Sequence, residues 1–152
     1  MQTQTSTQTS NLHDASSLSR TYQLLRFTYG LVPFLAGLDK FFNFLTDWEK
    51  YLPPAVADLL PVSPRVFMGV VGVIEMVAGL VVLTVLPRVG ALVVMIWLVA
   101  VALSAALAGY FDVAVRDLVM AVGAYALAQL AARHDASFHE PIGARESLRQ
   151  HA

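Results

Sequence analysis

Residues 64–86 read PRVFMGVVGVIEMVAGLVVLTVL, an apolar stretch in which Glu75 is the only charge past the first turn. At about 1.5 Å per residue, a helix of this length spans a hydrocarbon core of roughly 30 Å. Backbone amides inside lipid must be satisfied within the segment, so a stretch of this kind forms a helix. Ser63 and Pro64 supply an N-cap residue and a proline at the first helical position, which places the helix start.

Three further apolar blocks of similar length flank this one. They are residues 22–45, 88–110 and 113–132. Pro87 and Asp112 mark short turns on either side of the third block, and short turns make neighbouring helices antiparallel. We therefore predict an all-α membrane protein, a four-transmembrane-helix antiparallel bundle over residues 22–132.

The two ends of the chain differ from these blocks in composition. Residues 1–21 are mostly Gln, Thr and Ser, and residues 133–152 are polar and mixed in charge. Segments with so little to bury do not form a core, so we predict disordered polar tails. The N-terminal tail also lacks the positive charge and apolar segment of a cleavable signal peptide.

The overall composition favours a membrane location. Hydrophobic residues make up 57% of the 152 and charged residues 14%, whereas a soluble domain carries about 25% charged residues. The net charge of −1 leaves no basic excess for nucleic-acid binding. The chain has no cysteine, which excludes disulfides, iron–sulfur clusters and thiolate metal sites.

The connection over residues 46–63 is the longest between the blocks. It contains three prolines among apolar and aromatic residues. We interpret it as a short segment lying in the membrane interface, with Trp48 and Tyr51 as belt aromatics. A plain solvated loop is the alternative.

Four spans place both termini on one side of the membrane. Six basic residues lie near that side, namely Arg20, Arg26, Arg88, Arg133, Arg145 and Arg149. Four lie near the other side, namely Lys40, Lys50, Arg65 and Arg116. This bias predicts a multi-pass membrane protein with both termini in the cytoplasm.

The first block carries positive charge at both ends of a stripe of small residues. The members of this stripe recur every three or four residues and so share one helix face: Arg26, Gly30, Pro33, Gly37 and Lys40. Small residues on a face let neighbouring helices approach closely. Asp39 lies about 100° from Lys40 around the helix and is predicted to face another neighbour or the head groups.

Glu75 is the counterpart of these charges in the second block. Gly72, Glu75 and Gly79 step by three and four residues, and Glu75 lies near the middle of its span. An ionisable group at that depth needs a partner. Arg26 and Lys40 lie at similar depths on opposite sides of the midplane, so either can pair with it.

Three interpretations of Glu75 remain open. It is a structural ion pair that fixes helix register, a carboxyl kept protonated by its apolar surroundings, or a functional proton or ligand site. Adding the glycines and the basic residue that opens the third block gives the full candidate network of buried charge and packing. Its members are Arg26, Gly30, Gly37, Asp39, Lys40, Glu75, Gly79 and Arg88.

The fourth block opens with Asp112, Arg116 and Asp117. Asp112 and Arg116 are four residues apart and Asp117 follows, and we predict interfacial surface pairs of low energetic value among these three residues. The four histidines, His13, His134, His139 and His151, all lie in the predicted tails, so neither a bis-His haem nor a metal site is expected. No catalytic residue or cofactor is identifiable, and a quinone is left open without a specific motif.

The spacing Arg26-x3-Gly30-x6-Gly37-x2-Lys40, followed by Glu75-x3-Gly79-x8-Arg88, resembles the DoxX-like family of small four-helix membrane proteins. The resemblance covers roughly residues 22–132. It implies a four-helix inner-membrane bundle that belongs to membrane redox assemblies. Some relatives are subunits of thiosulfate:quinone or terminal quinol oxidase systems, and others accompany oxidative-stress or methylamine-oxidation machinery.

Three functions follow from the residues and the resemblance. The first is a non-catalytic subunit or assembly partner of a membrane oxidoreductase or quinone-linked redox complex. The second is a small proton-coupled transporter or exporter with Glu75 as the coupling carboxylate, which needs a homodimer because four helices enclose little of a pathway. The third is a quinone-binding membrane enzyme that uses Arg26, Lys40 and Glu75 as its polar handle.

Overall fold

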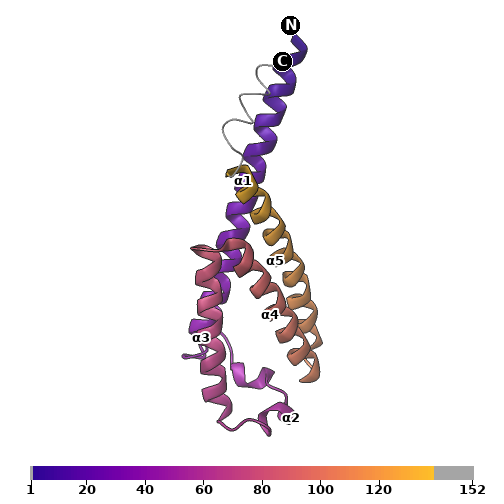
Figure 1. The fold of residues 1–152 in the computed structure, drawn as a ribbon. Coiled ribbons are helices and arrows are strands. Elements are labelled where there is room, and N and C mark those ends of the chain that lie inside the picture. The colour runs from indigo at the N-terminus through magenta and orange to yellow at the C-terminus, as the bar shows by residue number, and fades with distance from the viewer. Residues whose placement is uncertain (1, 139–152) are drawn as a thin grey trace.

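The computed structural model describes the backbone of residues 2–138 and the side chains of residues 16–134. Within this part the chain is helical and contains no strand, which confirms the all-α class (Figure 1). The long helices are α1 (Gln2–Asp39), α3 (Pro64–Leu83), α4 (Pro87–Leu107) and α5 (Phe111–Phe138). A 3-10 helix, η1 (Trp48–Tyr51), and a single helical turn, α2 (Pro54–Ala57), lie in the link between α1 and α3.

Three of the long helices are apolar and long enough to cross a bilayer. They are α3, α4 and the Phe111–His134 part of α5. Among the described residues α1 does not meet the same standard, because Arg26, Asp39 and a polar N-terminal half interrupt its apolar residues. Of the four predicted spans, length and composition therefore support three.

The structure places helix in part of each predicted tail. Residues 1–21 were predicted to be disordered, whereas α1 begins at Gln2. No glycine or proline precedes Gly30, so no residue of this stretch interrupts a helix that continues back from the bundle. At the other end α5 runs to Phe138, and the remaining residues of the C-terminal tail lie outside the part of the chain that the structure describes.

The helices of the bundle keep the predicted order, but the first three end earlier than predicted. The first was predicted over residues 22–45 and ends at Asp39, while α3 and α4 each end three residues before their predicted limits. The Asp39 carboxylate accepts hydrogen bonds from the backbone N–H groups of the following turn, in which Asn43 has a φ of 53°. These bonds stabilise a turn in place of further helix.

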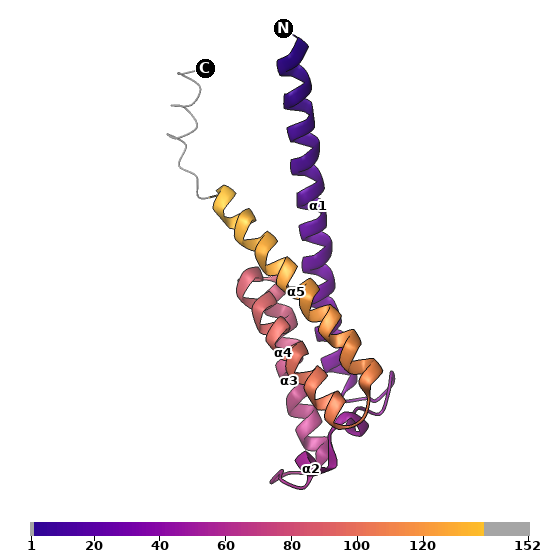
Figure 2. The ribbon, with the colours of Figure 1, turned by 90° about the vertical axis from the view of Figure 1, so that its right-hand side faces the viewer.

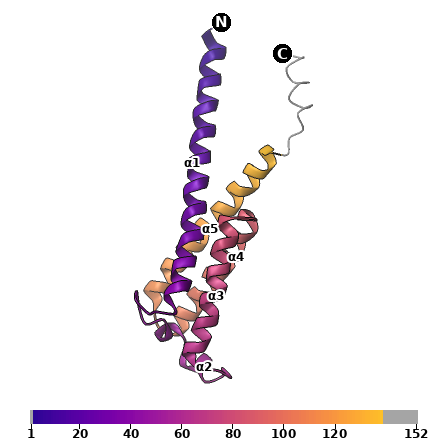
Figure 3. The same ribbon diagram turned by 90° about the vertical axis from the view of Figure 1, so that its left-hand side faces the viewer.

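The long helices alternate in direction and form two closely packed pairs. The N-terminal end of α1 and the C-terminal end of α5 lie at one end of the bundle, and the link with η1 and α2 lies at the other (Figures 1, 2 and 3). α1 packs mainly on α3, and α4 packs mainly on α5, with fewer contacts between these two pairs. The bundle is therefore an α1–α3 pair set against an α4–α5 pair.

Four glycines hold the α1–α3 pair at backbone contact distance. Gly30 faces Gly79, and Gly37 faces Gly72. A Cβ atom on any of the four would meet the backbone carbonyl oxygen of its partner. We call these residues the glycine seam, and their lack of side chains is what allows the two helices to pack so closely.

The α4–α5 pair is packed through alanines. The buried ones are Ala91, Ala102 and Ala105 of α4, with Ala114, Ala121, Ala124, Ala128 and Ala131 of α5. Leu127 is fully buried among them, and Val94 is 3% exposed. The Tyr29 hydroxyl of α1 donates to the Met120 carbonyl oxygen of α5 at 2.7 Å, which connects the two pairs.

Arg26 caps the C-terminal turn of α3. Its guanidinium group donates hydrogen bonds to the carbonyl oxygens of Val82 (3.1 Å), Leu83 (2.7 Å) and Thr84 (3.1 Å). The last carbonyls of a helix lack intrahelical partners, and the helix dipole makes this end attractive to a cation. Arg26 therefore joins α1 to α3 at one end of the glycine seam.

We expect Arg26→Leu to lower the free energy of unfolding of the detergent-solubilised protein by about 2 kcal/mol, because hydrogen bonds to charged groups contribute roughly 1.5–3 kcal/mol. Thermal melts followed by circular dichroism measure the change. Arg20→Leu is the matched control, since Arg20 is exposed on the same helix. Identical melting of the two variants would contradict the capping role.

Candidate functional site

A cavity of about 540 Å³ lies between the two helix pairs, at the end of the bundle that carries η1. Residues of the link, α3, α4 and α5 line it, together with Lys40 at the end of α1. The polar lining residues are Lys40, Thr46, Glu75, Ser104, Arg116 and Asp117. The aromatic lining residues are Trp48, Tyr51, Phe67 and Trp97. Its volume is that of a small-molecule binding site.

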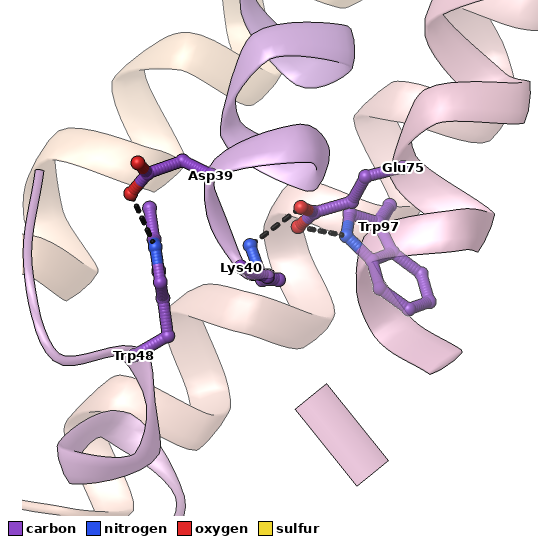
Figure 4. Close-up of polar contacts among 5 residues, drawn as sticks. All are labelled: Asp39, Lys40, Trp48, Glu75 and Trp97. Carbon is purple, nitrogen blue, oxygen red and sulfur yellow. Dashed lines mark hydrogen bonds and ion pairs between the residues drawn. The ribbon is translucent and has the colours of Figure 1, made fainter. Parts of the chain in front are cut away.

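The centre of the cavity wall is an ion pair between the two helices of the α1–α3 pair. Lys40 Nζ lies 2.5 Å from Glu75 Oε2, and the two side chains are 5% and 10% exposed (Figure 4). The other carboxylate oxygen, Oε1, accepts a hydrogen bond of 3.1 Å from the indole N–H of Trp97 on α4. Each carboxylate oxygen of Glu75 thus has a partner, one partner from the α1–α3 pair and the other from the α4–α5 pair.

Asp39 organises the chain just beyond α1. Its carboxylate accepts a hydrogen bond of 2.8 Å from the Trp48 indole N–H (Figure 4). It also accepts hydrogen bonds from the backbone N–H groups of Phe44 and Leu45. The neighbouring Lys40 Nζ lies 3.8 Å from the centroid of the Trp48 ring. Asp39 and Lys40 point in different directions, in agreement with their angular separation, and both contact Trp48.

The segment η1 is also attached to the α4–α5 pair. The Ser104 hydroxyl of α4 donates to the Tyr51 carbonyl oxygen at 3.3 Å. The ring of Tyr51 meets that of Tyr110 edge to face, with centroids 5.0 Å apart. Trp48 is bound by Asp39 of α1, and Tyr51 contacts α4 and the turn that follows it. The segment η1 therefore connects the two helix pairs at this end of the bundle.

Asp117 is the site residue whose environment the sequence did not reveal. We predicted interfacial surface pairs among Asp112, Arg116 and Asp117, and in the structure Arg116 Nε lies 3.3 Å from Asp117 Oδ1. The side chain of Asp117 is 7% exposed and lines the cavity, while that of Arg116 is 65% exposed. Asp117 follows Ala114 by three residues, which places it on the buried alanine face of α5.

The predicted charge network is divided between separate places. Lys40 is the partner of Glu75, whereas Arg26 lies over the C-terminal turn of α3 and does not line the cavity. Arg88 is exposed in the first turn of α4, and the predicted glycines belong to the glycine seam. Arg26, Lys40 and Glu75 therefore do not form a single polar binding site.

The cavity offers three kinds of interaction to a ligand. An ammonium group has three N–H donors, and Lys40 shares them between Glu75 and the Trp48 ring, so donor capacity remains. Asp117 supplies carboxylate acceptors, and the aromatic rings supply flat apolar surfaces. Among the described residues no group of three or more His, Asp or Glu side chains is placed to hold a metal ion. Apolar walls with a few polar groups suit a small amphipathic molecule.

A family model described as DoxX matches residues 22–107, which is more than half of the chain. The matched region includes the glycine seam and most of the residues that line the cavity, among them Lys40, Glu75 and Trp97, whereas Asp117 lies beyond it. No curated protein and no solved structure matches the chain.

Proposed function

This chain belongs to the DoxX family, and on that basis we propose that it is a non-catalytic subunit or assembly partner of a quinone-linked membrane oxidoreductase complex. The family match and the apolar helices make it a multi-pass membrane protein. The association with a membrane redox complex is what the family resemblance implies. A subunit of this kind needs a part that a partner can bind, and α1 supplies one.

The length of α1 is the observation that carries the proposal. Its 38 residues extend about 57 Å, nearly twice the roughly 30 Å of a hydrocarbon core. Residues 2–21, which we call the arm, project beyond the bundle at the end where α5 also finishes (Figures 2 and 3). A polar helix without an apolar stripe gains little stability alone, so we propose that the oxidoreductase partner packs against it.

The orientation of the bundle in the membrane determines on which side the arm lies. We propose residues 22–39 of α1 as a fourth span, because Arg26 and Lys40 are both partnered by α3 and so are compatible with a membrane interior. Six basic residues near the terminal side against four on the other support cytoplasmic termini in the inner membrane. The arm then extends into the cytoplasm.

Deleting residues 2–15 tests this role. We expect the shortened protein to lose its oxidoreductase partner during co-purification from the native membrane in mild detergent, because the arm supplies the contact. The thermal midpoint of the shortened protein should stay that of the full chain, since the bundle is intact. Deletion of residues 139–152 removes the same number of residues and serves as the matched control, which should retain the partner.

Two outcomes contradict the proposal in different ways. Recovery of the same partner with residues 2–15 deleted contradicts the role of the arm. Purification of the full chain from native membranes without any oxidoreductase subunit contradicts the proposed function itself.

The cavity favours a second candidate, a small transporter or exporter. It lies inside the bundle, has the volume of a ligand site and holds charged side chains. Glu75, the coupling carboxylate of this candidate, forms an ion pair with Lys40, so proton uptake by Glu75 would release Lys40. Because four helices enclose little of a pathway, this candidate acts as a homodimer.

A further inference from the structure

The aromatic residues around the cavity already hold two cations of the chain itself. Lys40 Nζ lies 3.8 Å from the centroid of the Trp48 ring, and Lys50 Nζ lies 4.9 Å from that of Tyr51. Both distances are within the roughly 6 Å over which a ring face attracts a cation. The two rings of η1 thus present π faces at which positive charge is stabilised.

The charges on the cavity wall are unequally buried. Lys40 and Glu75 neutralise each other across 2.5 Å, and both side chains are almost fully covered. Asp117 is equally buried, but the side chain of its partner Arg116 is 65% exposed. Because an exposed cation is screened by its surroundings, the interior wall keeps an excess of negative potential at Asp117.

We propose that this cavity binds a hydrophobic organic monocation, of the class of tertiary or quaternary ammonium compounds with alkyl or aryl groups. The positive centre lies beside Asp117, and the apolar groups pack on Trp48, Tyr51 and Trp97. An anion in the same place would lose its hydration beside Glu75 and Asp117, and the buried cation there, Lys40, is already paired with Glu75, so anion binding is unfavourable. A neutral molecule would leave the charge of Asp117 balanced only by Arg116, whose side chain is mostly exposed. The site depends on neither proposed function, because binding occurs whether or not the protein assembles or transports.

The two tryptophans of the chain make the site measurable. Trp48 and Trp97 are the only tryptophans, and both line the cavity. Intrinsic tryptophan fluorescence of the purified full chain in detergent therefore reports on this site. The probe is tetraphenylphosphonium, and tetraphenylborate is its control, an anion of nearly the same size and shape. We expect a saturable fluorescence change with the phosphonium and a non-saturable one with the borate.

A pair of variants on α5 assigns the binding to Asp117. Asp117→Asn should weaken phosphonium binding by about tenfold, because the amide keeps the size and the acceptor for Arg116 but removes the buried charge. Asp112→Asn is the matched control and should bind like the parent, since Asp112 is exposed and does not line the cavity. Thermal melts show whether each variant is folded. Asp117→Glu keeps the charge and should retain binding, which provides a second measurement if the amide misfolds.

The outcomes separate clearly. Saturable phosphonium binding that is weakened in Asp117→Asn and kept in Asp112→Asn supports the site. Equal affinity for the cation and the anion, or unchanged affinity in a folded Asp117→Asn, overturns it, as does loss of binding in a folded Asp117→Glu. The co-purification experiment on the arm is independent of this titration, so failure of one is distinguishable from failure of the other.

Discussion

Glu75→Ala should lower the free energy of unfolding of the detergent-solubilised protein by about 3–5 kcal/mol. The substitution leaves the Lys40 ammonium group buried, with its side chain 5% exposed, and removes the carboxylate 2.5 Å away. It also removes the acceptor of the Trp97 indole N–H. An unpaired charge in a covered site is the most expensive consequence of breaking such a pair. Thermal and denaturant unfolding measure the loss.

A double variant shows whether the unpaired charge is the cause. Lys40→Met combined with Glu75→Leu should recover most of the stability lost in Glu75→Ala, because neither charge remains. Asp58→Asn, an exposed carboxylate of the link, is the control and should melt like the parent. Glu75→Gln separates the interpretations of this residue. If the ion pair is purely structural, the variant is destabilised, and if Glu75 is a functional site, the variant stays folded. Parental stability in Glu75→Ala would contradict a structural pair.

Gly37→Ala and Gly79→Ala should each lower the free energy of unfolding by about 2–3 kcal/mol, although alanine is the better helix former. A Cβ at residue 37 meets the carbonyl oxygen of Gly72, and one at residue 79 meets that of Gly30. A backbone atom cannot rotate away as a side chain can. The two helices must therefore separate, and packing is lost along the whole glycine seam. The same unfolding measurements detect the change.

Gly69→Ala on α3 is the matched control for these substitutions. A Cβ there meets only the Phe41 ring, at 3.7 Å, which is an ordinary contact. We expect it to be neutral or to stabilise the protein by up to about 1 kcal/mol through helix propensity. A Gly37→Ala variant as stable as Gly69→Ala would contradict the close approach of α1 and α3.

The membrane helices and the glycine seam were predictable because both follow from short-range periodicity. Glycines at spacings of three and four residues share a face whatever lies opposite them. The partner of Glu75 was not predictable, because helix arithmetic placed Arg26 and Lys40 at similar depths. Two features of the folded chain decide it: the carbonyl groups at the end of α3 bind Arg26, and α1 ends at Asp39 just before Lys40.

The burial of Asp117 on the α5 side of the cavity could not be predicted from the local sequence, because it depends on how α5 packs against α4. Asp117 lies in the opening turns of its helix, next to a cation, and such acids are usually exposed. It is buried because α5 packs its alanine face on α4, and Asp117 shares that face with Ala114 and Ala121. The spacing from those two alanines was the available signal. The contact of Trp97 with Glu75 joins different helices and had no local signal.

The separation of Arg26 from its partners along the chain has a consequence for biosynthesis. The carbonyl groups that it binds lie 56, 57 and 58 residues downstream, and the carboxylate that binds Lys40 lies 35 residues downstream. A nascent chain therefore exposes α1 with both cations unsatisfied until α3 has been synthesised. The other three long helices meet the apolar standard of a membrane span and α1 does not. On the proposed four-span topology, stable integration of α1 into the bilayer therefore has to await α3, and the two helices enter the membrane as a hairpin.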